Sequence, residues 1–327
     1  DRHLRRQMFR VYQADIKTVD GFCASLLREH IHLLEPVDGR CLTPDFRVLD
    51  EAEAQLLRER ALERTMETFY QDIENGDEEA AQLAGTLGAG RDDRALTALV
   101  LELHSKIQSH PYPEKWLRAA AESWRQLPSS LADSDYGRTV MEDTVRRALF
   151  WAGQLERAVA AMEDCEPVYK ANAAQFLAAA AELRRYEQAS QEGWDAMGRV
   201  QPVLQRAGAV KNGENDEAKA AAKAVREKYK KAKEEMTAPY LVAEREHLED
   251  LQAAAPSMLA LLRLTERFSQ RYQAEKVRRN AMDFSDQEHY AVTLLCGQDD
   301  EPTDLARQVS QRYQEIMVDE YQDTNEV

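Results

Sequence analysis

Helical periodicity is the feature that most constrains this chain, because it runs almost without a break from Asp45 to Gln273. Apolar residues recur there at a spacing near 3.6, which places them on one face of a helix. Turn-forming residues interrupt the pattern at five places and divide it into several long helices. The interruptions are Gly85 to Gly90, Ser109 to Pro113, Pro128 to Ser130, Gly208 to Gly213, and Pro256. The pattern predicts a mainly helical fold with a large all-helical domain.

Composition agrees with a helical protein and limits what it can bind. Charged residues make up 31% of the 327 positions, and there are only 13 glycines and 10 prolines. The formal net charge of −16 repels a polyanion at long range, which argues against nucleic-acid binding over the whole surface. Residues 50–102 hold fourteen acidic and five basic residues, whereas residues 263–279 hold six basic and two acidic ones. Any nucleic-acid contact is therefore expected to be local.

Cysteine usage and hydropathy indicate where the protein resides. The four cysteines form no C-x-x-C pair and have no histidine at ligand spacing, so we expect reduced thiols. No apolar run approaches the roughly 18 residues of a membrane span, and no apolar stretch follows the charged N-terminus. The sequence predicts a soluble intracellular protein. We interpret both ends as internal to a longer polypeptide, because the chain stops directly after its most informative motif.

The first patterned segment combines strand-like and helix-like residues. Residues 14–19 alternate in polarity and include β-branched side chains, which is typical of a strand. The next residues have helical spacing, with Phe22, Leu26 and Leu27 on one face. We expect a strand, a tight turn and a helix, with the carboxylate of Asp20 capping the first helical turn. An ordinary strand-to-helix connection without a function is the alternative.

The stretch from Ala218 to Glu235 is rich in alanine, lysine and glutamate and has little apolar surface. It predicts a helix that projects into solvent or pairs weakly with a neighbour. This stretch also suggests a coiled-coil scaffold as one interpretation of the chain. We disfavour that interpretation, because no sustained heptad of apolar residues is apparent.

Arginines recur every four residues on one face of the helix that follows. Arg263, Arg267 and Arg271 form this row, and an apolar stripe from Met258 to Tyr272 occupies another face. The row fits a solvated helix face. It also fits a stripe that tracks the phosphates of DNA.

Two acidic residues, Asp283 and Asp286, open a further helix. Residues three apart share a helical face, so the pair could serve the chemistry of a hydrolase. Capping of the helix by Asp283 or Ser285 accounts for the pattern more simply. We therefore expect a structural role for these carboxylates.

The last apolar stretch of the chain ends in two adjacent carboxylates, Asp319 and Glu320. We expect Glu315 to Glu320 to be a short strand that holds both acids at the carboxyl edge of a parallel sheet. There Asp319 can hold magnesium, directly or through water, and Glu320 can orient an attacking water. Taken alone, the pattern also fits an ordinary strand end at the surface.

Several motifs resemble one family of enzymes. Residues 318–325, Val-Asp-Glu-Tyr-Gln-Asp-Thr-Asn, closely resemble the DE(F/Y)QDTN signature of UvrD-like superfamily 1 helicases. Residues 18–23 resemble the T-x-H-S-F-C element with which these enzymes touch single-stranded DNA, although Asp20 and Gly21 replace the usual His and Ser. Residues 109–117 and 282–290 look like two elements of the AddA subfamily, the helicase-nuclease subunit of the bacterial AddAB complex that repairs double-strand breaks. Together these motifs span nearly the whole chain, but residues 120–252 match only in helical character.

The resemblance implies a domain arrangement. Residues 1–44 and 277–327 would be two pieces of a RecA-like α/β motor domain, 1A, with a few parallel strands, and the second piece would end in the Walker B motif. Residues 45–276 would be a helical inserted domain of the 1B type, which in this family lies over the DNA near the duplex junction. The fold class that follows is mainly α with a partial α/β motor domain.

The resemblance also implies roles, cofactors and partners. Glu320 would be catalytic, Asp319 would bind Mg²⁺, and Asp319 and Gln322 would contact ATP. The implied DNA-binding residues are Thr18, Phe22, Arg263, Arg267 and Arg271. The implied partners are single-stranded DNA, the duplex junction and an AddB-type subunit. The implied location is the bacterial cytoplasm, and the implied process is recombination and repair of DNA damage.

One element of such an ATPase does not occur in the sequence. There is no G-x-x-x-x-G-K-[ST], and the glycine-rich stretch from Gly85 to Gly90 contains no lysine. Without amides and a lysine to neutralise the phosphates, nucleotide affinity should collapse. We expect the chain to be part of an ATP-dependent DNA helicase, inactive in isolation, with the nuclease domain outside it. The alternative is a non-catalytic helical module that binds DNA or docks to a partner protein.

Overall fold

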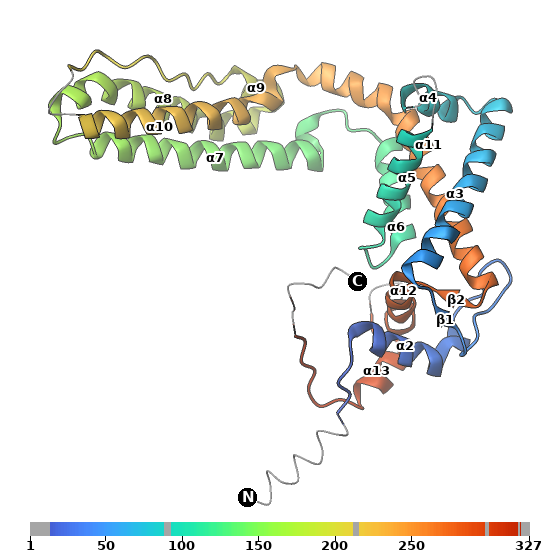
Figure 1. Cartoon of the computed structure of the whole chain (residues 1–327). Coiled ribbons are helices and arrows are strands. Elements are labelled where there is room, and N and C mark those ends of the chain that lie inside the picture. The colour runs from blue at the N-terminus through green and yellow to red at the C-terminus, as the bar shows by residue number, and fades with distance from the viewer. Residues whose placement is uncertain (1–13, 88–92, 212–215, 298–300, 320, 322–327) are drawn as a thin grey trace, which may run out of the picture. The chain divides into compact units, whose positions relative to one another are not determined.

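The computed structural model describes residues 14–87, 93–211, 216–297, 301–319 and 321. Helices dominate, and the described residues contain one sheet of two short strands, which confirms the predicted mainly α fold with limited sheet. Residues 1–125 together with 255–327 form one compact unit, here called the split unit. Residues 126–254 form a second, here called the helical unit (Figure 1). The domain boundaries implied at residues 44 and 276 stay predictions.

The split unit is assembled from both ends of the chain. Its elements are α2 (Val19–His30), η1 (Ile31–Leu33), β1 (Arg47–Val48), α3 (Glu51–Glu74), α4 (Glu78–Leu87), α5 (Arg94–Ile107), α6 (Pro113–Arg125), the later part of α11 (Glu244–Arg278), β2 (Ala281–Met282), α12 (Phe284–Leu295) and α13 (Asp304–Ser310). The two strands are parallel and pair Arg47 with Ala281 and Val48 with Met282. Residues far apart in the sequence therefore lie side by side.

A left-handed turn at Asn280 joins α11 to β2. Its φ is 48°, a conformation that asparagine tolerates better than most residues. The Asn280 side-chain oxygen accepts a hydrogen bond from the backbone N–H of Thr43 at 2.9 Å. The turn after α11 thus also holds the chain that leads into β1.

The core of the split unit lies between α3, α5 and α11. The predicted apolar stripe of α11 is buried there: Leu261, Phe268 and Tyr272 are 4%, 0% and 2% exposed. They pack in one cluster with residues such as Phe69 of α3 and Val100 of α5. Burial of this stripe confirms the prediction made from its spacing.

The helical unit is continuous in sequence. It contains η2 (Leu131–Asp133), α7 (Asp135–Ala160), α8 (Glu166–Glu192), α9 (Trp194–Arg199), α10 (Asp216–Thr237), η3 (Ala238–Leu241) and the first part of α11. Ser134 caps α7 by accepting a hydrogen bond from the N–H of Gly137 at 2.9 Å. A Cβ at position 137 would lie 1.9 Å from the Leu131 carbonyl oxygen, so this close approach requires glycine. None of the described helices is both long and apolar enough to cross a lipid bilayer.

Helix α10 packs against α7 and α8 (Figure 1), so the prediction of a projecting or weakly paired helix is wrong. The residues of its packed face follow the alternating spacings of four and three that define a heptad, so the statement that no apolar heptad is apparent in this stretch is also wrong. They are Ala218, Ala222, Val225, Tyr229, Ala232 and Met236. The alanines of this packed face allow close approach of the helices, and Tyr229 and Met236 fill the remaining space.

Two predicted strands are not formed. Residues 14–18 have no regular structure before α2, and Ile16 is 80% exposed. Residues 315–319 are likewise irregular, and the side chains of Ile316 and Met317 are 80% and 85% exposed. A β-strand exists only where its N–H and C=O groups pair with a neighbour, and the described residues place no strand beside either segment.

Other local predictions had mixed outcomes. The breaks at Ser109 to Pro113 and Pro128 to Ser130 are confirmed, whereas Pro256 lies inside α11 and does not interrupt it. A proline removes one backbone donor, and the strong helix formers around it keep the remaining bonds. The N-terminal cap of α2 is Thr18, not Asp20, which lies in the first turn. Thr18 has the extended backbone of a cap residue, with φ −68° and ψ 161°.

Candidate functional site

Helix α2 begins at the segment that resembles a DNA-contact element. The Thr18 hydroxyl oxygen accepts a hydrogen bond from the N–H of Gly21 at 3.1 Å, and the residue is exposed. Phe22 is half-buried and packs edge to face against Tyr313, with ring centroids 6.3 Å apart. Both side chains therefore already have structural contacts, and Thr18 remains open to solvent.

The first described helix, α2, packs against the last two, α12 and α13, at this point. Cys23 and Leu26 of α2 share a buried cluster with Ala291 of α12 and Val309 of α13 (Figure 1). The Tyr313 hydroxyl donates to the Asp15 carboxylate at 2.9 Å, and this contact helps to lower the pKa of Asp15, behind the larger effect of a hydrogen bond from Lys17. The segment leading to the acidic pair is thereby tied to the segment leading into α2.

Asp319, the first residue of the acidic pair, lies near the end of the described residues. Asp319 is exposed and follows an irregular segment in which Val318 is 53% exposed. The other two residues implied at the nucleotide, Glu320 and Gln322, lie outside the described residues. The structure therefore places one of the three implied nucleotide-site residues, and Asp319 does not follow a described strand.

The residues present fit only part of a site for Mg²⁺ and ATP. Asp319 offers the hard oxygen ligand that Mg²⁺ prefers. The described residues contain no group of three or more His, Cys, Asp or Glu side chains arranged to hold a metal ion. No glycine-rich loop with a lysine occurs in the sequence to neutralise the phosphates. A complete nucleotide site cannot be assembled from these residues alone.

The arginine row on α11 faces acidic side chains. Arg263 binds Asp77 at 3.0 Å and Glu79 at 2.6 Å, and Arg267 binds Asp72. Arg271 donates to the backbone oxygen of Arg64 and to the Thr68 hydroxyl. The row is thus held against α3 and the residues that follow it, and is not a free solvated face. A DNA phosphate would have to replace these partners.

Asp283 and Asp286 form a capping box at the start of α12, which confirms the structural interpretation. Each carboxylate accepts a hydrogen bond from the backbone N–H of the other, at 2.9 and 3.0 Å. Lys276 donates to Asp283 at 2.9 Å and to Asp286 at 2.7 Å, and its side chain is only 4% exposed. We call these three residues the buried ionic cluster.

The buried ionic cluster lies at the edge of a hollow of about 980 Å³ in the split unit, formed by α5, α6, α11 and α12. Burial raises the pKa of Asp283, but Lys276 outweighs this effect and brings the pKa to about 2. Burial raises the pKa of Asp286. Because Lys276 and the backbone N–H groups of the cap already bind both carboxylates, Asp283 and Asp286 are not free to act as an acid and base pair.

His104 lies on another wall of the same hollow. Its ring packs edge to face against Phe268, at a centroid distance of 5.0 Å, and its Nδ1 lies 2.8 Å from the Ser269 hydroxyl. Burial, reinforced by the charge of Lys276, lowers the pKa of His104 to about 4. The imidazole is therefore neutral near pH 7.

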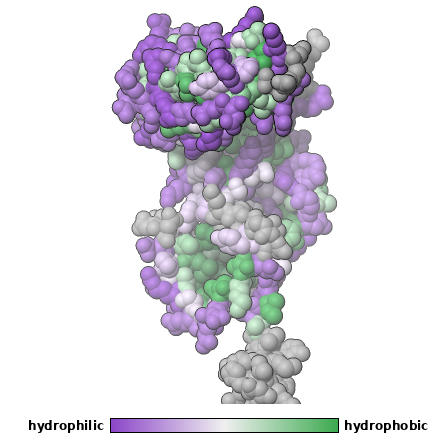
Figure 2. All heavy atoms as spheres, turned by 90° about the vertical axis from the view of Figure 1, so that its left-hand side faces the viewer, coloured by the Kyte–Doolittle hydropathy of each residue, from purple (hydrophilic) through white to green (hydrophobic). Residues whose placement is uncertain are grey.

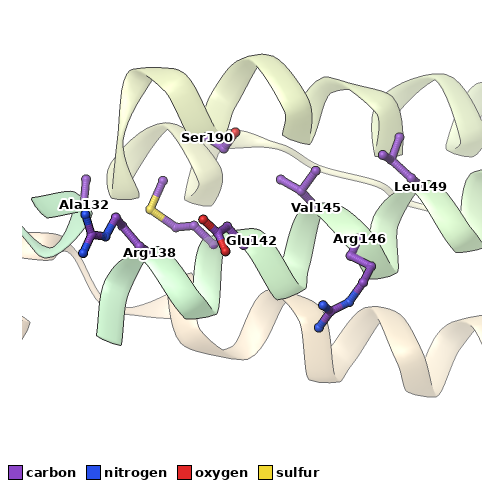
Figure 3. Close-up of a pocket in the computed structure, with 8 residues that line it drawn as sticks. Ala132, Arg138, Glu142, Val145, Arg146, Leu149 and Ser190 are labelled. Atoms are coloured by element: carbon purple, nitrogen blue, oxygen red, sulfur yellow. The ribbon is translucent and has the colours of Figure 1, made fainter. Parts of the chain in front are cut away.

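A second hollow, of about 670 Å³, runs along α7 in the helical unit (Figure 3). Val145 and Leu149 extend toward the neighbouring helix, whereas Arg146 points away from it. Arg146 is paired with Asp143 and Arg138 with Asp135. The hollow is mainly apolar and holds no set of groups that suggests chemistry.

The family model for the UvrD/REP helicase N-terminal domain matches residues 3–327. The chain belongs to this family of helicases. It is also similar to proteins named as subunits of an ATP-dependent helicase/nuclease. Those from Ruminiclostridium cellulolyticum and Desulforamulus reducens are 27% and 31% identical, over 99% and 100% of this chain. The chain spans about a quarter of the length of these relatives, 26% in both cases.

Proposed function

We propose that this chain is the part of an ATP-dependent DNA helicase/nuclease subunit that contains one side of its nucleotide site and a DNA-contact segment. The curated relatives are named for helicase and nuclease functions, and the chain matches them over nearly its whole length. The proposed role of the parent protein is repair of double-strand breaks and recombination, and its proposed partners are DNA and an AddB-type subunit. The nuclease domain is assigned to a region outside this chain.

The packing of the two chain ends carries this proposal. Each end contains one motif of the family, and α2 packs against α12 and α13. A motor domain interrupted by an insertion requires its pieces to meet in this way. The exposed apolar residues before Asp319, including Ile316 and Met317, fit a strand that pairs only when further strands of the sheet are present.

In this proposal Asp319 holds Mg²⁺, Glu320 orients the attacking water and Gln322 contacts the nucleotide. The bound nucleotide would supply the reactive phosphate, and the metal would neutralise part of its charge. The phosphate contacts would come from another part of the longer polypeptide. Thr18 and Phe22 are proposed DNA contacts, as are the α11 arginines once their carboxylate partners are displaced.

The test of the nucleotide assignment is Glu320→Gln in the longer subunit. We expect ATP hydrolysis to fall by at least about a thousandfold while ATP binding is retained, because the amide cannot act as a base. Single-turnover hydrolysis and equilibrium binding of a fluorescent ATP analogue measure the two effects. Turnover that survives the change would remove Glu320 from this role.

The 327-residue chain alone provides a second test. We expect no DNA-stimulated ATP hydrolysis above background, because the sequence contains no phosphate-binding loop. Phosphate release is measured with and without single-stranded DNA, with a variant carrying Glu320→Gln as the blank. If the chain hydrolyses ATP and the Glu320→Gln variant does not, the chain contains a complete nucleotide site. That result would overturn the proposed division of the site.

A further inference from the structure

Tyr313 lies between α13, which ends at Ser310, and the irregular segment that leads to Asp319. Its side chain is half-buried and packs against the apolar cluster formed by α2, α12 and α13. The ring contacts Phe22 edge to face, with centroids 6.3 Å apart and an interplanar angle of 66°. Tyr313 therefore touches a proposed DNA-contact residue and also precedes the proposed magnesium ligand.

The hydroxyl of Tyr313 reaches the segment that leads into α2. It donates to the Asp15 carboxylate at 2.9 Å. Lys17 binds the same carboxylate at 3.1 Å and donates to the Ser25 hydroxyl of α2 at 3.5 Å. Asp15 is thus held against the beginning of α2, and Tyr313 is held to Asp15.

The bond between Tyr313 and Asp15 joins a neutral donor to a charged acceptor. Hydrogen bonds from Lys17 and from Tyr313 lower the pKa of Asp15, so this carboxylate is ionised near pH 7. The hydrogen bond to Asp15 raises the pKa of the Tyr313 hydroxyl, which therefore keeps its proton. Hydrogen bonds with one ionised partner are shorter and stronger than those between neutral groups. Removal of the hydroxyl alone is therefore expected to weaken the link between the two segments.

Both segments that leave this contact are irregular and exposed. Asp15 precedes Thr18 by three positions, and Tyr313 precedes Asp319 by six. Ile16 and Met317 are 80% and 85% exposed, and hydrophobic side chains gather on the visible face of the split unit in Figure 2. Among the described residues neither segment pairs with a strand. The contact between Asp15 and Tyr313 therefore fixes where each segment starts.

We propose that Tyr313 is a positioning residue that couples DNA contact at α2 to the nucleotide site at Asp319. The inference rests on the proposed function for the roles of Phe22 and Asp319. DNA that moves Phe22, or the segment before Thr18, changes the contacts of Tyr313 and thereby the start of the segment that ends in Asp319. The coupling acts in both directions, because a free energy shared by two binding sites changes the affinity of each by the same factor.

The test is Tyr313→Phe in the longer subunit, since phenylalanine keeps the ring contact and removes the hydroxyl. The measured quantity is the stimulation ratio, which is the rate of ATP hydrolysis with saturating oligothymidylate divided by the rate without DNA. We expect this ratio to fall about fivefold, at the lower end of the range for coupled sites. Hydrolysis without DNA should be unchanged, because the substitution removes no group from the nucleotide site.

Equilibrium binding gives a readout that a purely structural role would not change. The affinity of Tyr313→Phe for oligothymidylate without nucleotide should match that of the wild-type protein. The change in this affinity on addition of a nonhydrolysable ATP analogue should be smaller in the variant, because the coupling is reciprocal. Fluorescence anisotropy measures both affinities.

A double-mutant cycle with Asp15→Ala tests whether the hydrogen bond itself carries the coupling. Each single variant should lower the stimulation ratio to a similar extent. The variant with both Asp15→Ala and Tyr313→Phe should lose no more than either single variant, because the bond is already broken in each. Losses that multiply in the double variant would show that the two residues act independently and would overturn the inference.

Arg312→Gln is the matched control. Arg312 is the neighbour of Tyr313 and binds Glu29, near the other end of α2, at 3.0 Å, with both side chains 53% exposed. This variant should keep the wild-type stimulation ratio. An equal loss in the control would mean that any contact between this segment and α2 is sufficient, and would overturn the role assigned to Tyr313.

The wild-type subunit separates this inference from the proposed function. Stimulation by DNA that persists unchanged in Tyr313→Phe would overturn the inference and leave the proposed function standing. Equal losses of hydrolysis with and without DNA would show that Tyr313 only supports the fold, and would also overturn the inference. A wild-type subunit whose ATP hydrolysis does not respond to DNA would contradict the proposed function and the coupling with it.

Discussion

The arginine row of α11 and four exposed lysines of α10 are both basic helix surfaces, but the fold uses them differently. The lysines are Lys223, Lys228, Lys230 and Lys231, here called the lysine face. Arg263 and Arg267 contact carboxylates of the same unit at side-chain exposures of 40% and 41%. The lysine face has no carboxylate partner among the described residues. The spacing of the arginines fits either a solvated face or a DNA contact, and the structure shows that carboxylates of the same unit already occupy this row. Periodicity identifies which charges share a face and cannot identify what lies opposite.

The two surfaces differ in the type of basic residue that each contains. Arginine forms fixed, forked contacts and suits ion pairs between helices. Lysine on an exposed helix keeps its hydration and its mobility until a partner arrives. Arginines join helices in both units, as Arg267 does with Asp72 and Arg184 with Glu156, whereas the lysines of α10 are presented to solvent. The predictions that follow challenge this division, beginning with the largest expected effect.

Replacement of Lys276 by Met should destabilise the split unit by about 3–5 kcal/mol, because it leaves the buried Asp286 without its cation. Thermal and urea unfolding measure the loss. The triple variant Lys276→Met, Asp283→Asn, Asp286→Asn should recover part of it, since both asparagines keep the capping contacts. A single variant as stable as the wild type would show that the buried ionic cluster does not hold the unit together.

The pH dependence of stability should contain a contribution from His104. Its pKa is lowered to about 4 in the folded state, whereas the unfolded value is about 6.5. The unfolded state therefore binds the proton more readily, and stability should fall as pH drops from about 6.5 to 4, by at most about 1.4 kcal/mol per pH unit.

Asp286 titrates with the opposite sign, because its pKa is raised to about 6 by burial. The informative quantity is consequently the difference between the wild-type protein and His104→Gln, measured by urea unfolding at intervals from about pH 7.5 to 4.5. Glutamine can still contact the Ser269 hydroxyl and does not titrate. Parallel curves for the two proteins would show that His104 is not kept neutral by the fold.

Arg267→Gln should have a small effect on stability. The ion pair with Asp72 is partly exposed, and such pairs contribute about 0.2–1 kcal/mol. A double-mutant cycle with Asp72→Asn isolates the coupling, which should shrink between about 50 and 500 mM salt. A coupling energy of zero at low salt would show that Asp72 does not hold Arg267. The arginine row would then not differ from the lysine face in this respect.

The smallest expected effect is on the stability of the lysine-face variant. Exposed positions without partners change stability by about 0.5 kcal/mol or less. Circular dichroism melting of the variant with Lys223→Gln, Lys230→Gln and Lys231→Gln should match the wild-type protein. A clear loss of stability would show that these lysines have a structural role like that of the arginines.

Much of the helical architecture follows from the sequence, because helix signals are local. The stripe from Met258 to Tyr272 and the cap at Asp283 are set by residues a few positions apart, and both predictions are confirmed. The packed face of α10 is harder to predict, since half of its six residues are alanine, which gives only a weak hydrophobic signal. The alternating spacing of Ala218, Ala222 and Val225 is the signal that the sequence offers for it.

The two strand predictions failed because strand formation depends on residues that are distant in the sequence, whereas helix formation depends on neighbouring ones. Residues 14–19 and 315–320 have the right composition, but a strand depends on a partner that composition does not supply. A backbone hydrogen bond in an α-helix always joins residues four positions apart, whereas β1 pairs with residues near position 281. The same limit applies to the arginine row, whose partners Asp72 and Asp77 lie far away in the sequence.

The parallel pairing of β1 with β2 also sets an order of events during synthesis. The contiguous residues 126–254 can collapse as soon as they leave the ribosome, while Val48 must wait for Met282 to be made. Closing a chain segment of this length by diffusion is entropically costly, and a prefolded insertion shortens the flexible part. A helical unit that folds first would therefore lower the entropic cost of bringing β1 and β2 together.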